Sequence, residues 1–494
     1  MSDAQTLDST VSKTLSTTAS PLGPTLLVDG LKPAFAPPTI EAPEKPLSYL
    51  RLLRAATRNP IEMWPAEIFE KPFVTRNWVG NQKVHFIASP ELLKLVMLDH
   101  HANFPQGFIQ RRLLKPVMGE GLLTSQGEVW KRQRRATSPA FRIDNLRSMV
   151  PTMWRAGELA ADDLCRNIEG SNNGNAPIDV HPVMTMATLE VIIDLLLGGD
   201  DSGMRRADVA HTVSTYRDTL GKVDLFLMLG VPKWVPRPWM NKGRKAVENM
   251  RVSAEKVIIN RRNKPKNEND APPDLLDLML SARDPETGEG LSDIELRDNI
   301  MTFISAGHET TALALTWALY LIANDREVQT RLYNEVVSIC GDGDVCSENI
   351  EALTYCLQVV REAMRLFPPV PVRSNQAVED ITLGDLDVKQ NDHIVCLMYA
   401  LHRHKALWKN PSEFNPENFS KEAIEGRHRF QYIPFGGGPR ICIAMRMAEL
   451  EAVAILAAMV RRLEFLPNPD HIPLPQLKIT ASPIGGMPLN VRKR

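Results

Sequence analysis

The sequence has few of the features that would place it in the simplest classes of protein. Only six cysteines occur among 494 residues, and none forms a C-x-x-C pair, which excludes a disulfide scaffold and the common zinc motifs. Lysine and arginine (58 together) nearly balance aspartate and glutamate (59 together), so no net field is available to hold a nucleic acid. We therefore expect a globular, cytoplasmic protein without a nucleic-acid partner.

Long apolar runs are also lacking. No uninterrupted stretch reaches the roughly 18–20 apolar residues that a bilayer-spanning helix requires, so we expect no transmembrane anchor. Met1–Pro46 is rich in Ser, Thr and Pro, which predicts a flexible leader, and residues 47–494 are expected to form a single domain. The apolar Leu225–Trp239 segment, with its Pro and Trp residues, is a candidate for an access lid or for weak contact with a membrane.

Hydrophobic periodicity predicts a mainly α protein of the α+β class. Helical periodicity dominates from Glu128 to Phe367, apart from a charged loop at Lys264–Pro273. A helix is expected to begin at Ser89-Pro90, with Ser89 as its N-cap. The remaining elements are predicted as a hairpin at 73–87 turned at Gly80-Asn81, a small sheet at 372–399, a helix at 442–463 and a hairpin at 477–491 turned at Gly485-Gly486.

The most informative segment runs from Phe435 through three successive glycines to Cys442. Glycines allow backbone amides to approach a neighbour closely. Cys442 is predicted at the start of an apolar helix, where unpaired N–H groups and the helix dipole favour the thiolate. Such a sulfur is suited to be a nucleophile or a metal ligand, and a buried structural cysteine is the simpler alternative.

This segment resembles the haem-binding loop of the cytochrome P450 family, F-x-x-G-x-R-x-C-x-G, in which the cysteine thiolate is the axial ligand of the iron. Phe435, Gly438, Arg440 and Cys442 match the pattern, and Ala444 replaces its last glycine. The resemblance implies that Cys442 ligates the iron of haem b. It implies further contacts with the cofactor from Trp130, Arg134, Ala306, Arg373, Phe435, Gly436 and Arg440.

A second block, from Ala306 to Thr311, is predicted on a helix. The Thr310 hydroxyl can bond back to the Ala306 carbonyl, which weakens the helix at that turn. The block is similar to the oxygen-activation signature of the same family, which implies that Glu309 and Thr310 are catalytic and deliver protons. On the segment alone, a mid-helix glycine beside a solvent-facing glutamate is an equal alternative.

Two further patterns support the resemblance. Glu362 and Arg365 lie three apart on one helical face, and the Trp408–Phe419 segment is close to the meander of the family, although Asn418 replaces the usual arginine. This substitution predicts that a network of three charges loses its third member. Trp130 and Arg134, four apart, resemble the pair that binds a haem propionate in the family, with a solvated basic face as the alternative, and Arg373 is a second propionate candidate.

The ordered segments imply the P450 fold, with a large helical body, a small β-rich lobe and a buried haem. They imply a haem-thiolate monooxygenase that inserts one oxygen atom from O2 into a hydrophobic small molecule by hydroxylation or epoxidation. Apolar residues at Phe108–Leu122, Val370–Val372 and Ile484 are the implied substrate contacts. A peroxide-driven or isomerising haem-thiolate enzyme, and a non-enzymatic haem sensor, stay open as alternatives.

Electrons are expected to come from NAD(P)H through a separate protein, because the segment after Cys442 is too short for a flavin or iron–sulfur domain. A ferredoxin with its reductase, or a flavin reductase, would serve. The expected docking face carries five cations that could meet an acidic partner: Lys131, Arg132, Arg135, Arg427 and Arg429.

Overall fold

The computed structural model describes residues 34–77, 82–170, 176–199, 204, 206–219, 240–263 and 273–494. Met1–Ala34 and Phe35–Arg494 form separate units. Phe35 and Ile40, which the sequence assigned to the leader, instead pack against the hydrophobic cores of the larger unit. The predictions for Leu225–Trp239, and for residues 264–272 of the charged loop, lie outside the described residues.

Helices make up most of the described chain, as the periodicity predicted. Their bounds are α1 Tyr49–Arg58, α2 Pro90–Lys94, α3 Phe108–Met118, α4 Gly127–Thr137, α5 Ile143–Arg147, α6 Val150–Gly170, α7 Val180–Leu197, α8 Arg206–Thr219, α10 Asn241–Asn263, α11 Leu275–Ser281, α12 Asp293–Asn324, α13 Arg326–Cys340, α14 Thr354–Leu366, α15 Met398–Leu401, α16 Lys421–Ile424 and α17 Met445–Arg462. The predicted N-cap of α2 is confirmed, because the Ser89 side chain accepts from the Leu92 N–H at 3.3 Å.

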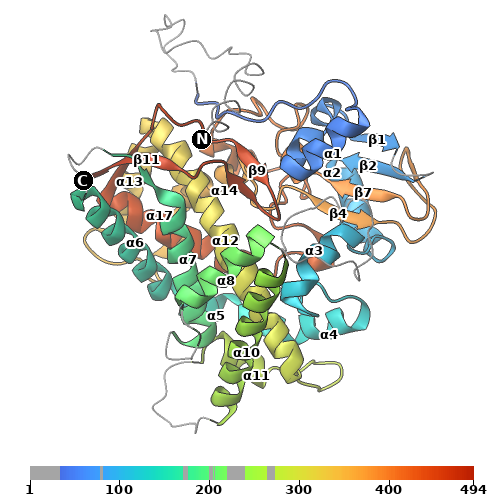
Figure 1. Ribbon diagram of the computed structural model, residues 1–494. Helices are drawn as coiled ribbons and strands as arrows, with labels where there is room; N and C mark the ends of the chain where they lie inside the picture. The colour runs from blue at the N-terminus through green and yellow to red at the C-terminus, as the bar shows by residue number, and fades with distance from the viewer. Residues whose placement is uncertain are drawn as a thin grey trace, which may run out of the picture. The chain divides into compact units, whose positions relative to one another are not determined.

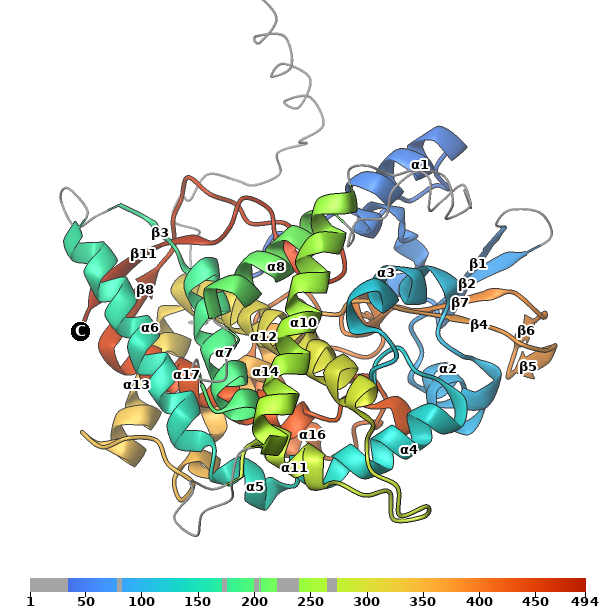
Figure 2. The same cartoon turned by 60° about the horizontal axis from the view of Figure 1, so that its bottom comes forward.

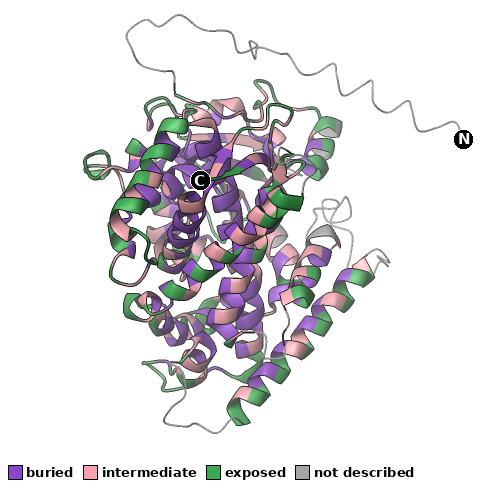
Figure 3. Cartoon of the chain, turned by 90° about the vertical axis from the view of Figure 1, so that its left-hand side faces the viewer, coloured by how far each residue is buried: buried purple, intermediate pink, exposed green. Residues whose placement is uncertain are grey.

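The longest described helix, α12, lies among α7, α14 and α17 in both ribbon views (Figures 1 and 2). It begins with a capping box, in which the Ser292 side chain accepts from the Glu295 N–H and the Glu295 carboxylate accepts from the Ser292 N–H. Most of its residues are buried, as are most of those of α7, α14 and α17. Figure 3 shows the buried residues gathered in the interior of the helical body. A helix that is apolar on nearly every face belongs in a protein interior, and α12 is the axis of the helical core.

The neighbouring helix α7 bears on the expectation that no segment is long and apolar enough to span a membrane. Within the described residues, it is the one helix long and apolar enough to cross a membrane. It is also 67% buried inside the protein and packs along α12. Its composition is therefore accounted for by its place in the core.

Helices α6 and α17 approach each other closely at Gly157. A Cβ atom at this position would lie 2.7 Å from the Cβ of Ala458, well inside van der Waals contact. The glycine therefore sets the spacing that brings α17, the helix after the Cys442 loop, against the core.

The β structure is distributed over small sheets, as expected for the minor component. The strands are β1 Phe73–Asn77, β2 Lys83–Ile87, β3 Ile178–Asp179, β4 Arg373–Gln376, β5 Ile381–Leu383, β6 Leu386–Val388, β7 His393–Cys396, β8 Leu463–Leu466, β9 Pro475–Leu477, β10 Ala481–Pro483 and β11 Pro488–Lys493. The largest described sheet has the order β1-β2-β7-β4, in which β2 and β7 are parallel and the other pairs antiparallel. The predicted hairpin at 73–87 is confirmed in its strands, and its turn at Gly80-Asn81 lies outside the described residues.

The C-terminal prediction is wrong in its pairing. β9 pairs with β10, whereas β11 pairs with β8 and β3, so 477–491 is not one hairpin. Gly485 and Gly486, with φ of 78° and 80°, do form a turn, but it carries the chain from one sheet to another. The last helix begins at Met445, so Cys442 precedes it by three residues instead of opening it.

Candidate functional site

The loop before Cys442 is closed by its own backbone. The Cys442 N–H donates to the Phe435 carbonyl at 3.0 Å, and the Ile441 N–H donates to the Gly438 carbonyl at 3.1 Å. Gly438 has a φ of 67°, and a Cβ atom there would lie 1.9 Å from the Met97 carbonyl oxygen. Glycine is therefore required where the loop crosses the Leu95–Asp99 turn. The close crossing and the backbone hydrogen bonds together fix the position of Cys442.

The Cys442 side chain is exposed, although its sulfur lies in a densely packed part of the fold. Burial raises the pKa of its thiol, while a hydrogen bond from the Ala444 N–H and the cation of Arg134 lower it. Of these influences burial is the largest, and the other two favour the thiolate, as the sequence predicted. An accessible sulfur of this kind becomes a thiolate when a metal cation binds it.

Three arginines gather near the cysteine. The Arg440 guanidinium stacks over the Trp130 ring, 4.2 Å from its centroid, and donates to the Ser125 carbonyl at 2.8 Å. Burial, together with the cations of Arg373 and Arg134, lowers the pKa of Arg440 to about 10. Cations that repel one another in a partly buried place suit a ligand with more than one negative charge.

The residues present fit haem b. The accessible sulfur suits the iron, the glycine loop lets the backbone come close to a planar ring, and the Arg134, Arg373 and Arg440 cations suit the two propionates. The structure thus brings together the predicted Trp130, Arg134, Arg373, Arg440 and Cys442, which are spread over more than 300 residues of sequence.

The hydrogen bond predicted within the Ala306–Thr311 block is present, and α12 is a continuous helix through it. The Thr310 hydroxyl donates to the Ala306 carbonyl at 2.8 Å, as expected, and the Thr311 hydroxyl donates to the Gly307 carbonyl at 3.2 Å. Glu309 points elsewhere, because its carboxylate accepts a hydrogen bond of 2.9 Å from the Thr480 hydroxyl. Consecutive helical residues face different directions, so the acid and the alcohol have separate partners.

Two polar residues of this region were missed by the sequence reasoning. Thr480 lies in the turn between β9 and β10, 171 residues from Glu309. No local sequence pattern predicts a hydrogen bond between residues so far apart. Glu451 is buried on α17, where burial raises the pKa of its carboxyl group to about 8 and a hydrogen bond with Thr311 lowers it. An acid within an apolar helix was the available signal for Glu451.

The Glu362–Arg365 pair is fully buried, with both carboxylate oxygens 2.8 Å from guanidinium nitrogens. Arg365 also donates to the backbone carbonyls of Pro411 and Glu413 in the meander segment, and to the carbonyl of His402 before it. Asn418 donates to Glu362 at 3.1 Å, and Arg427, stacked over Trp408 at 4.6 Å, is close enough to interact with the Glu362 charge. The sequence predicted that the network loses its third charge. The structure corrects this prediction, because Arg427 supplies the third charge.

The predicted docking cations are mostly engaged. Arg132 pairs with Glu295, Arg135 makes two hydrogen bonds of 2.7 and 2.9 Å to Asp284, and Lys131 pairs with Glu128 at 2.7 Å. Arg427 is half-buried and Arg429 is exposed. A cleft of about 360 Å³ lies against the Cys442 loop, and its basic lining residues are Arg361, Arg427, His428, Arg429 and Arg446.

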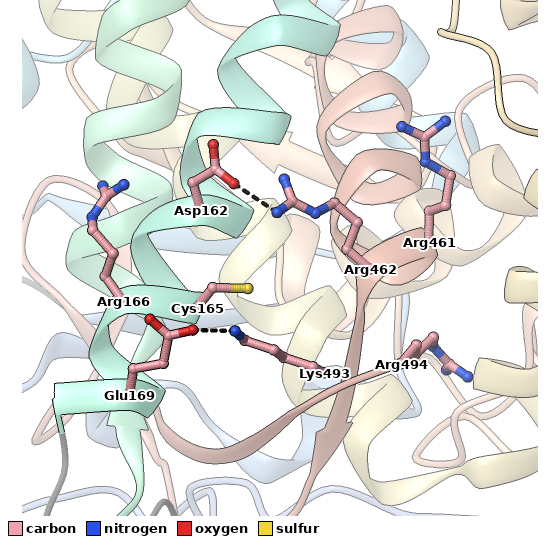
Figure 4. A pocket seen from close by; sticks show the side chains of 8 residues that line it. All are labelled: Asp162, Cys165, Arg166, Glu169, Arg461, Arg462, Lys493 and Arg494. Atoms are coloured by element: carbon pink, nitrogen blue, oxygen red, sulfur yellow. Dashed lines mark hydrogen bonds and ion pairs between the residues drawn. The ribbon is translucent and has the colours of Figure 1, made fainter.

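A second cleft, of about 490 Å³, is lined by residues of α6, the end of α17 and the C-terminal strand (Figure 4). Its lining is charged, and its cations have partners: Arg462 pairs with Asp162 at 2.6 Å, and Lys493 pairs with Glu169. This ion-paired groove has the wrong chemistry for a hydrophobic substrate.

Comparisons with known proteins agree with this geometry. The family model for cytochrome P450 matches residues 44–486. Cytochrome P450 4V2 from Homo sapiens is 30% identical, over 71% of this chain and 69% of that protein. The taurochenodeoxycholic 6 alpha-hydroxylase from Sus scrofa and the chloroplastic protein LUTEIN DEFICIENT 5 from Arabidopsis thaliana are each 28% identical over 84% of this chain, covering 83% and 71% of those proteins.

A solved structure, the haem domain of cytochrome P450DA, superposes with a TM-score of 0.75. The match is 24% identical and covers 93% of this chain and 99% of the other, which shows the fold. The predicted fold class is confirmed, with its helical body and small β lobe. The family carries haem b on a cysteine thiolate and catalyses monooxygenation. The chain therefore belongs to the cytochrome P450 family of haem-thiolate monooxygenases.

Proposed function

We propose that the chain oxygenates a hydrophobic small molecule at a site built on Cys442, with electrons from NAD(P)H delivered by a separate protein. The observation that carries this proposal is an accessible sulfur, held on a glycine loop, beside the cations of Arg134 and Arg440. When haem is bound there, it supplies the activation of O2.

In this proposal each site residue has a defined task. Cys442 holds the iron, and its sulfur accepts a hydrogen bond from the Ala444 N–H. Arg134, Arg373 and Arg440 bind the propionates as charge-assisted partners. The Ala306 carbonyl accepts the hydrogen bond of the Thr310 hydroxyl. Phe435 and Gly436 belong to the same loop and would contact the cofactor.

Glu309 and Thr310 form the proton path. The Glu309 carboxylate takes up a proton from solvent and passes it through water to the Thr310 hydroxyl, which directs it to the reacting oxygen. Thr310 requires the Ala306 carbonyl to orient that hydroxyl, and the 2.8 Å bond between them supports this task. A peroxide-driven enzyme or a haem sensor needs no such path.

The substrate is proposed to be hydrophobic. Leu114, Val117 and Leu122, from the early loop expected to touch it, belong to the main core. Val370, Val372 and Ile484 are half-buried or exposed, so they are the better candidates. The name of the Sus scrofa relative, a 6 alpha-hydroxylase, supports C–H hydroxylation as the reaction.

The electron donor is proposed to dock at the cleft against the Cys442 loop, through Arg429 and Arg446. Arg429 is exposed, and the Arg446 side chain is 62% exposed although it pairs with Glu449. Arg132 and Arg135 are poor candidates because their charges are already neutralised. An acidic ferredoxin fits this face. Charge reversal at Arg429 and Arg446 should slow electron transfer, and the same change at Arg135 should destabilise the protein instead.

A cytoplasmic location is proposed because all six cysteines are free. Fractionation of expressing cells tests it.

The activity is tested with the holoprotein, a surrogate ferredoxin with its reductase, and a panel of dodecanoic acid, limonene, progesterone and naphthalene. We expect at least one compound to shift the haem spectrum and to give an oxygenated product that depends on NADPH. Product that forms with hydrogen peroxide at full rate, and not with NADPH, would favour the peroxide-driven alternative. Haem binding without any turnover would favour the sensor.

A further inference from the structure

One hydrogen bond joins the proton path to a distant part of the chain. The Thr480 hydroxyl donates to Oε1 of Glu309 at 2.9 Å. Thr480 is 6% exposed, and Glu309 is half-buried on α12. The contact is therefore partly shielded from bulk water, and a hydroxyl and a carboxylate hold each other more firmly there than at an open surface.

The turn that carries Thr480 is fixed by its neighbours. The Lys478 N–H donates to the Thr480 carbonyl at 3.1 Å, and the Ala481 N–H donates to the Pro369 carbonyl at 2.9 Å. The indole N–H of Trp317, two turns further along α12, reaches the Ala481 carbonyl at 3.5 Å. The β9–β10 hairpin is thus attached to α12 and to the segment after α14, and the Thr480 hydroxyl is presented by a rigid frame.

The Glu309 carboxylate also faces α8. Burial and the Glu309 charge both raise the pKa of the Tyr216 phenol on that helix. The Tyr216 hydroxyl donates to the Leu113 carbonyl of α3. The carboxylate therefore lies where α8, α12 and the β9–β10 hairpin meet, while Thr310 directs its hydroxyl to Ala306.

We propose that Thr480 is a positioning residue that sets the direction of the Glu309 carboxylate, and that it links proton delivery to the substrate end of the pocket. This inference rests on the proposed proton role of Glu309. The chain leads from Thr480 into β10 and on to Ile484, a proposed substrate contact, and the hairpin also bonds to Pro369, next to Val370. A substrate that contacts Ile484 or Val370 can therefore shift the β9–β10 hairpin, and with it the Thr480 hydroxyl that holds the Glu309 carboxylate.

The consequence concerns how electrons are used. When protons arrive out of step with electrons, reduced oxygen leaves as hydrogen peroxide and the organic product is not formed. Removal of the Thr480 hydroxyl frees the carboxylate to rotate, so we expect a larger share of the NADPH consumed to appear as peroxide.

The test compares Thr480→Val, Thr480→Ser, Glu309→Gln and the double variant Glu309→Gln/Thr480→Val. Ser482→Ala, which removes a hydroxyl from the same hairpin, is the control. Each holoprotein is assayed with the surrogate ferredoxin pair and the panel compound that gives the largest spectral shift. The readouts are peroxide per NADPH, the solvent deuterium isotope effect on NADPH oxidation, the melting temperature and the haem spectrum.

We expect Thr480→Val to raise peroxide per NADPH about threefold and to increase the isotope effect, with the haem spectrum unchanged. Thr480→Ser and Ser482→Ala should resemble the parent. The double variant should equal Glu309→Gln, because Thr480 acts through the carboxylate.

The inference is overturned if Thr480→Val leaves peroxide and isotope effect unchanged while Glu309→Gln alters both, or if the two changes add in the double variant. It is also overturned if Thr480→Ser is as uncoupled as Thr480→Val at equal melting temperature. A Glu309→Gln variant with parental coupling would instead contradict the proton role of Glu309 and with it the proposed function.

Discussion

The two sides of the haem site are held together in different ways. On the cysteine side, the Glu362–Arg365 pair is fully buried, and a glycine loop crosses a backbone carbonyl with no room for a side chain. On the α12 side, single hydroxyl groups make the contacts, from Thr310 to Ala306 and from Thr480 to Glu309. Buried charges and close backbone contacts determine whether the fold is stable, whereas a single hydroxyl hydrogen bond determines only the direction of one side chain. Changes on the first side should therefore affect stability and haem retention, and changes on the second should affect how protons are used.

The largest effect is expected from Glu362→Ala. This change leaves the Arg365 guanidinium buried without its carboxylate, which typically costs about 3–5 kcal/mol. Urea unfolding of the parent and the variant measures it. Lys389→Ala is the control, because Lys389 and its partner Asp380 are 67% and 60% exposed and such pairs contribute about 0–1 kcal/mol. Equal losses for the two variants would show that burial does not distinguish the pairs.

Glu451 should give the protein a distinctive pH dependence. Its pKa is about 8 in the fold and near 4.5 when exposed, so between these values the folded state binds the proton that the unfolded state releases. The free energy of unfolding therefore falls as pH rises from about 4.5 to about 8, by up to about 1.4 kcal/mol per pH unit.

Glu451→Gln has no titratable carboxyl group at this position, so its free energy of unfolding should not show this fall with pH. Relative to the parent, the urea midpoint of the variant should be higher at pH 8.5 than at pH 5.5. Parallel pH profiles for the two proteins would mean that Glu451 is ionised in the fold.

Arg440→Leu should weaken haem retention on the cysteine side by about tenfold, because it removes a propionate partner next to the iron site and the stack on Trp130. Transfer of haem to apomyoglobin gives the rate of loss. Arg429→Leu, an exposed arginine on the same loop region, should lose haem at the parental rate. If both variants retain haem equally well, Arg440 does not bind the cofactor.

Asn418→Ala should have the smallest effect. It removes one hydrogen bond to the Glu362 carboxylate, which is worth about 1–2 kcal/mol, and Arg427 remains as the nearby cation. Thermal and urea unfolding should show a modest loss, smaller than that of Arg427→Leu. An effect of Asn418→Ala as large as that of Glu362→Ala would show that Asn418, not Arg427, completes the network.

The same contrast explains what the sequence could predict. The Cys442 loop, the Thr310–Ala306 bond and the Glu362–Arg365 pair each lie within a few residues, so local spacing and helix geometry reveal them. The helical class and the presence of strands at 73–87 and within 372–399 follow from periodicity, whereas the parallel pairing of β2 with β7 does not. The pairing of β11 with β8, the contact of Thr480 with Glu309 and the approach of Arg427 to Glu362 depend on packing between distant segments. The burial of the Cys442 sulfur likewise depends on packing that no local pattern shows.

The most direct measurement is the spectrum of the reduced protein with carbon monoxide. Ligation of the iron by the Cys442 thiolate predicts a strongly red-shifted Soret band in the parent and its loss in Cys442→Ser, while Cys165→Ser, at a half-buried cysteine on α6, keeps it. A red-shifted band that persists in Cys442→Ser would place the iron on another residue and contradict the account.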